Sequence, residues 1–109
     1  MGASKSSAFS THQNEMSNVF KALGHPARVA IVEYLMSTDA CICGDIVNEL
    51  PLAQPSISRH LKELKSVGLI QGEIQGTAIC YCLNPGLIKL LKHYFEDIHK
   101  TVKKLKTCC

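Results

Sequence analysis

Hydrophobic residues recur at helical spacing in the first third of the chain. A first helix is predicted from about Asn14 to Leu23, where Gly24 interrupts the pattern. Its apolar residues fall on one face: Met16, Val19, Phe20 and Leu23. Pro26 suits the first turn of a second helix, which is expected to end at Ser37. The residues expected to form its buried stripe are Val29, Val32, Leu35 and Met36.

The middle of the chain predicts a very short strand within Ala40–Cys43 and a short third helix at Ile46–Leu50. After a tight turn at residues 51–53, a fourth helix is expected over Gln54–Lys65. Its apolar positions form one narrow stripe: Ile57, Leu61 and Leu64. The rest of this helix is polar and basic, so it is one-sided.

Gly68 ends the fourth helix, and two alternating runs follow, at residues 69–75 and 78–83. Gly76 and Thr77 join them, which predicts a β-hairpin. From Gly86 onward a last helix carries a long apolar stripe: Leu87, Leu91, Tyr94, Ile98, Val102 and Leu105. This stripe exceeds what so small a domain can cover, so we expect a homodimer that exchanges helices. The fold class is mainly α with a small hairpin wing, in the order α-α-β-α-α-β-β-α.

Length and composition favour one domain. The chain has 109 residues, of which 46% are hydrophobic and 19% charged. We expect a flexible arm at residues 1–13, one domain at 14–106 and a cysteine-containing tail at 107–109. No apolar run reaches the ~18–20 residues of a membrane span, and the first residues do not resemble a signal peptide. The expected location is cytoplasmic, without a membrane partner, and the cysteines are therefore expected to be reduced.

The charge is concentrated in the second part of the chain. Residues 50–109 carry 9 Lys and Arg against 4 Asp and Glu, so an acidic partner is expected to bind there. Two helices joined by a short turn, followed by a hairpin, form a winged helix-turn-helix, in which the second helix enters the major groove of double-stranded DNA. The expected DNA contacts are Gln54, Ser56, Ser58, Arg59, His60, Lys62 and, in the hairpin, Gln75. The alternative is an ordinary solvated helix face.

Four segments of the chain resemble, in order, those of the ArsR/SmtB family of winged-helix repressors. They are Phe20–Arg28 (FKALGHPAR), Cys41–Ile46 (CICGDI), Gln54–Lys62 (QPSISRHLK) and Gly76–Leu83, which resembles the second strand of the family's wing. The resemblance covers roughly residues 14 to 105. It implies a homodimeric repressor of operator DNA that leaves the DNA when its sensing site is occupied, with the first and last helices forming the dimer interface.

In the winged-helix fold the short strand pairs with the second hairpin strand, so residues 41–43 are expected beside residues 80–82. Alternation then turns Ile42, Ile79, Tyr81 and Leu83 towards the core, and the cysteines towards the opposite face. The candidate metal ligands are Cys41, Cys43, Cys80 and Cys82. The alternative is that small cysteines fill space in a thin sheet.

Cysteines at the entry to the third helix typically bind arsenite, antimonite, cadmium or lead in the resembling family. Three thiolates suffice for As(III) or Sb(III), whereas four would also suit Zn(II) or Cd(II). Val47 and Asn48 stand where the family's third cysteine is expected, so a third ligand must come from the wing strand or the tail. The tail pair Cys108 and Cys109 either joins the site or is silent.

The leading hypothesis is a repressor that responds to arsenite or another soft metal(loid), with no obligatory cofactor. Two alternatives keep DNA binding: the cysteines sense oxidants or persulfides, or they hold a structural zinc ion. An enzyme is not expected, because the sequence has no Gly-rich phosphate loop, HExxH motif or nucleophile elbow.

Overall fold

A computed structural model describes the protein at residues 7–38, 42–43, 50–75 and 78–105, and leaves out the side chains of residues 42, 43, 74, 75 and 78. The elements are α1 (Thr11–Leu23), α2 (Pro26–Met36), β1 (Ile42–Cys43), α4 (Gln54–Ser66), β2 (Ile70–Gln75), β3 (Ala78–Leu83) and α5 (Pro85–Lys104). Their order confirms the mainly helical fold with an antiparallel hairpin. The short helix expected at Ile46–Leu50 lies outside the described residues apart from Leu50.

Helix α1 begins at Thr11, earlier than the apolar pattern predicts, because Ser10 caps it. The Ser10 hydroxyl accepts a hydrogen bond from the Gln13 backbone N–H at 3.0 Å. The Gln13 side chain in turn accepts one from the Ser10 N–H at 3.0 Å. This reciprocal capping box satisfies two backbone donors that a helix end leaves without partners. The first turn therefore forms from polar residues that the hydrophobic pattern does not mark.

The core lies where α2, α4 and the start of β2 meet. Its buried residues are Val19, Ile31, Leu35, Ile57, Leu61, Leu64, Leu69 and Ile70. The predicted stripe of α4 is confirmed, since Ile57 and Leu64 are 0% exposed and Leu61 is 5% exposed. Burial of each such side chain contributes about 1.5–3 kcal/mol.

The buried stripe predicted for α2 is partly wrong. Leu35 is buried, but Val29 is 39% and Met36 66% exposed, while Ile31 is the residue that reaches the centre of the core. The helix sequence PARVAIVEYLM is apolar on nearly every side. The helical period alone therefore does not indicate which face of α2 is buried. Contacts with the rest of the protein decide this.

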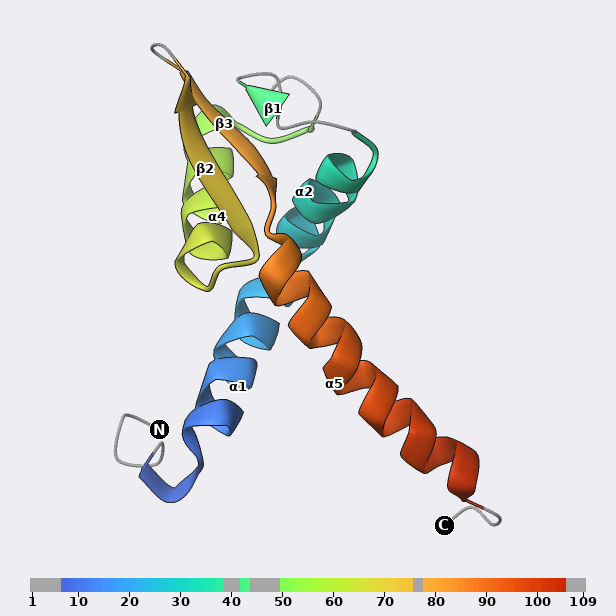
Figure 1. Cartoon of the computed structure of the whole chain (residues 1–109). Coiled ribbons are helices and arrows are strands. Elements are labelled where there is room, and N and C mark those ends of the chain that lie inside the picture. The colour runs from blue at the N-terminus through green and yellow to red at the C-terminus, as the bar shows by residue number, and fades with distance from the viewer. Residues whose placement is uncertain (1–6, 39–41, 44–49, 76–77, 106–109) are drawn as a thin grey trace.

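The three strands form one antiparallel sheet in the order β1-β3-β2, so β3 is the central strand (Figure 1). Ile42 pairs with Tyr81 and Cys43 with Cys80 across β1 and β3. On the other side of β3, Gly72 pairs with Tyr81. A Cβ atom at Gly72 would lie 3.4 Å from the Tyr81 ring and 3.3 Å from Lys65 Nζ, so glycine leaves room for these two side chains.

Two residues connect the end of α4 to the start of α5. Gly68 has a φ of +85°, a left-handed conformation that ends α4 and that side chains other than glycine rarely adopt. The Asn84 amide donates to the Gly68 carbonyl at 2.8 Å, and the Asn84 Oδ1 accepts from the Gly86 N–H at 3.1 Å. Asn84 therefore both caps α5 and holds its first turn against the α4–β2 turn.

Helices α1 and α5 extend away from the end of the molecule that holds the sheet and α4 (Figure 1). They touch through aromatic rings: Phe20 lies 5.7 Å from Tyr94 and 5.9 Å from Phe95 between ring centroids. Within α5, which the structure describes in full, no residue is buried. None of the helices in the described part of the chain has the length and apolar character needed to cross a bilayer.

Candidate functional site

The outer side of α4 presents most of the residues expected to contact DNA. Those that are exposed are Gln54, Ser58, Arg59 and Lys62, whereas Ser56 and His60 are half-buried. Gln75 is the last residue of β2, and its side chain lies outside the description. The structure therefore leaves Gln54, Ser58, Arg59 and Lys62 accessible on α4, and contact of any of these residues with DNA stays a prediction.

The N-terminus of α4 is open. Its N-cap residue, Ala53, makes no side-chain hydrogen bond, Pro55 lies in the first turn, and that turn contains no acidic residue. The free backbone N–H groups and the positive end of the helix dipole favour an anion. This end of α4 is thus compatible with a phosphate backbone.

His60 differs from the other predicted contacts because its ring is already held by the protein. Its Nδ1 accepts a hydrogen bond from Arg28 Nε at 3.1 Å. An acceptor nitrogen carries no proton, so this bond requires neutral His60 with its proton on Nε2. Only the Nε2 edge of the ring is then left to meet a base or a phosphate.

A second histidine lies against His60. The rings of His25 and His60 are 4.5 Å apart between centroids and tilted by 50°. His25 is the N-cap of α2, and its Nδ1 accepts from the Ala27 N–H at 3.0 Å. Burial lowers the pKa of His60 below its usual value, and charge interactions with its neighbours His25, Arg28 and Arg59 lower it further. Each effect favours the neutral ring that accepts from Arg28.

Neither Arg28 nor His25 was predicted from the sequence to have a functional role. Both lie in the segment Phe20–Arg28, which carries the family resemblance but no motif of known chemistry. The bond from Arg28 to His60 spans 32 positions in the sequence, so no local spacing could have indicated it.

The pairing of β1 with β3 that the winged-helix fold implies is confirmed in the described residues. Cys43 is directly opposite Cys80, and Ile42 is opposite Tyr81. Because directly paired residues share a face of an antiparallel sheet, Cys43 and Cys80 belong to one face and Tyr81 to the other. Tyr81 and Leu83 pack against the core cluster as expected, whereas Ile79, nearer the hairpin end, is 47% exposed.

The two wing cysteines differ in state and burial. Cys80 is 0% exposed and disulfide-bonded in this structure, contrary to the expectation that all cysteines are reduced. Cys82 is half-buried and outside any disulfide. Only a thiolate binds a metal, so Cys80 could become a ligand only after reduction.

The remaining predicted ligands are untested. Cys41, Cys108 and Cys109 lie outside the described residues. Among the residues that are described, no cluster of three or more His, Cys, Asp or Glu side chains is arranged to hold a metal ion. The metal site therefore remains a prediction that depends on more than Cys80 and Cys82.

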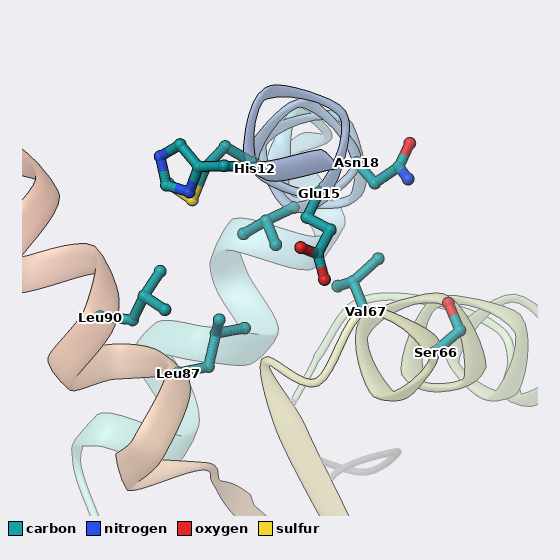
Figure 2. Close-up of a pocket in the computed structure, with 9 residues that line it drawn as sticks. His12, Glu15, Asn18, Ser66, Val67, Leu87 and Leu90 are labelled. Atoms are coloured by element: carbon teal, nitrogen blue, oxygen red, sulfur yellow. The ribbon is translucent and has the colours of Figure 1, made fainter. Parts of the chain in front are cut away.

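A hollow of about 280 Å³ separates α1 from the end of α4 and the start of α5 (Figure 2). Figure 2 shows His12 and Glu15 of α1 on the side towards Leu87 and Leu90 of α5, whereas Asn18 points away from them. The α1 and α5 helices are therefore not closely packed along this edge, which leaves apolar surface of both accessible.

Comparison with known proteins points to one group of regulators. The sequence profile described as bacterial regulatory protein, arsR family, matches residues 25–71. The chain is 31% identical over 85 residues to an arsenical resistance operon repressor of Staphylococcus xylosus, a match that covers 78% of this chain and 81% of that protein. It is 38% identical over 65 residues to the transcriptional repressor SmtB of Mycobacterium tuberculosis, over 60% of this chain. The chain spans about half of the mycobacterial protein, since that match covers 47% of it.

A solved structure confirms the fold. An ArsR-like transcriptional regulator from Rhodococcus sp. RHA1 superimposes with a TM-score of 0.72 at 23% identity, over 87% of this chain and 89% of that one. The proteins matched by sequence regulate transcription, which confirms the prediction that the chain is not an enzyme.

Proposed function

Because the chain belongs to the arsR family of bacterial regulatory proteins, we propose that it is a DNA-binding repressor that leaves its operator when cysteine thiolates bind a soft metal(loid), arsenite first. In this proposal α4 binds the operator. The inducer binds the cysteine face, which is the face of β1 and β3 that carries Cys43 and Cys80. The wing, which shares β3 with that face, carries the change towards the DNA.

The exposed side of α4 supports the DNA-binding part. Arg59 and Lys62 are exposed cations on a helix whose other side is fully buried, and the N-terminus of the helix is open. Short polar side chains at Gln54 and Ser58 leave room for the helix to approach base edges. Because the phosphates dominate affinity, we expect Arg59→Ala to weaken binding to every DNA sequence.

The observation that carries the sensor part is the β1–β3 register, with Cys43 opposite Cys80. Directly opposed residues have Cβ atoms about 4.5–5.5 Å apart, a separation at which two sulfurs can bind one ion. Thiolates are the preferred ligands of soft metals and metalloids. The relative named as an arsenical resistance operon repressor makes As(III), with Sb(III), the first inducer to test, ahead of Zn(II) and Cd(II).

Helix α5 supports a homodimer formed through α1 and α5. Its large apolar residues remain exposed in the single chain: Ile88, Leu90, Phe95, Ile98 and Val102. Exposing a continuous apolar stripe to water is unfavourable for a monomer, and contact with a second copy of the chain would bury this stripe.

The test is fluorescence anisotropy of labelled DNA from upstream of the protein's own gene, bound by fully reduced protein and titrated with arsenite. We expect anisotropy to fall near stoichiometric arsenite. The loss of DNA affinity that causes this fall should correspond to a coupling free energy of about 1–3 kcal/mol between arsenite and DNA binding. A complex that survives arsenite would refute the metalloid response. Absence of DNA binding by the reduced protein would refute the repressor itself.

Two serine variants localise the response. Cys43→Ser should bind DNA like the unmodified protein and no longer release it on addition of arsenite. The double variant Cys108→Ser with Cys109→Ser is the matched control, since it removes thiols from the tail and leaves the sheet intact. If Cys43→Ser still released DNA on addition of arsenite, the proposed site would be contradicted. If only the tail variant no longer released DNA, the site would lie in the tail.

The disulfide at Cys80 favours a second candidate, a repressor that senses oxidants through its thiols. Formation of a disulfide removes two electrons and two protons from a thiol pair, so it requires an oxidant and no metal. In the same assay, release by mild peroxide and recovery with dithiothreitol would support this candidate. Release by arsenite under reducing conditions would support the metalloid sensor.

A further inference from the structure

Arg28 connects the last turn of α1 to the middle of α4. Its Nη1 donates to the Ala22 carbonyl at 3.1 Å, and its Nε donates to His60 Nδ1 at 3.1 Å. Both bonds are partly buried, and the guanidinium group is planar with donors in fixed directions. One side chain of α2 therefore fixes two other helices at the same time.

His25 also contacts the His60 ring. It caps α2 through the Ala27 N–H, and its ring lies against His60. The ring of His60 is thus held by a hydrogen bond from Arg28 at Nδ1 and lies against the tilted ring of His25. His60 directly follows Arg59, which is an exposed cation of the same helix.

The surroundings of Arg28 do not favour a direct bond to phosphate. Arg28 lines a surface hollow together with Lys21 and Glu63, and the Glu63 carboxylate would repel an anion that entered it. Two of the donor nitrogens of Arg28 are already used within the protein. Arg28 is therefore better suited to orienting α4 than to contacting DNA.

We propose that Arg28 is a positioning residue for DNA recognition, which acts through His60 to hold α4 at a fixed angle to α1. The inference rests on the proposed function, in which α4 reads DNA and α1 belongs to the dimer interface. In a symmetric dimer, the angle between these helices sets the distance between the two recognition helices, and that distance selects the spacing of the DNA half-sites.

The test is the salt dependence of DNA binding by Arg28→Lys and Arg28→Ala. Lysine keeps the charge but cannot donate from two nitrogens in a fixed plane. We expect both variants to bind the upstream DNA at least about tenfold more weakly, a loss of ~1.4 kcal/mol. The slope of log K against log salt should stay unchanged, whereas loss of one phosphate contact would reduce it by about 0.9. Lys62→Ala is the matched control that should reduce the slope.

His60→Leu removes the acceptor of the same bond from the other helix. Combined with Arg28→Ala, it should weaken binding no more than the stronger single variant, because both remove one interaction. His60→Leu also keeps the test valid if Arg28→Ala fails to fold, as judged by circular dichroism. Wild-type affinity in Arg28→Lys, a reduced salt slope or additive losses would each overturn the proposal. Lack of DNA binding by the wild-type protein would instead refute the proposed function, and this inference with it.

Discussion

Helices α4 and α5 are both amphipathic, yet only one of them buries its apolar side within the chain. In α4, Ile57 and Leu64 are 0% exposed. In α5, Phe95 is 53% and Val102 54% exposed, and none of its residues is buried. The same helical period thus has two outcomes, because α4 packs on the core formed by α2 and the sheet while α5 extends beyond it. Amphipathicity indicates that a helix needs a partner surface, but it does not indicate which molecule supplies that surface.

The largest expected effect comes from a cavity under α4. Ile57→Ala removes part of a fully buried side chain, so we expect the free energy of unfolding in urea to fall by about 2–5 kcal/mol. The loss should be present at every protein concentration, because α4 completes its packing within one chain. Val29→Ala, at a 39% exposed position, is the control and should change stability by less than about 0.5 kcal/mol. Equal losses in the two variants would contradict the core assignment.

A charge in the α5 stripe should act on association instead. If a second copy covers α5, Ile98→Glu disrupts the same position twice in a symmetric dimer, and each buried side chain contributes about 1.5 kcal/mol or more. We expect the dimer dissociation constant from sedimentation velocity to rise at least about a hundredfold, which corresponds to ~3 kcal/mol. His99→Glu introduces the same charge at the adjacent position and should leave association nearly unchanged. A monomeric wild-type protein would show that α5 has another partner or none.

The smallest expected effect concerns the attachment of α4 through His60. In the folded protein the pKa of His60 lies below its ordinary value of 6.5, so between these two pKa values the unfolded chain binds more protons. Stability should therefore rise with pH through this interval and be lost as pH falls below about 6.5. The neighbouring groups whose charge interactions oppose protonation of His60 are His25, Arg28 and Arg59. Urea unfolding from pH 7.5 to pH 5 should show a shallower decline for His60→Gln; equal slopes would contradict the assignment.

Local signals in the sequence predicted most of the fold. Pro26 began α2 and Gly68 ended α4 as expected, because each imposes a backbone conformation independent of the rest of the protein. The start of α1 was missed although Ser10 and Gln13 have capping-box spacing, since that segment lacks apolar residues. The buried face of α2 could not be ranked, because apolar residues lie on nearly all its sides.

The candidate site was less predictable because it depends on distant contacts. The fold implied that Cys43 and Cys80 would be opposite each other, and the register confirms this. It did not indicate that Cys80 would be fully buried or disulfide-bonded. The hydrogen bond between Arg28 and His60 joins helices that only the tertiary fold brings together.

The central position of β3 makes the cysteine face and the wing one mechanical unit. A shift of its pairing by a single residue would exchange the two faces of β3 and take Tyr81 and Leu83 away from the core cluster, so the packing of these two residues protects the register of both neighbouring strands. Amides of β3 bond to partners on both sides and should be among the slowest in the sheet to exchange with deuterated water. A polar substitution at Tyr81 would thus loosen the β2–β3 hairpin and disturb the pairing of the two cysteine-bearing strands in one step.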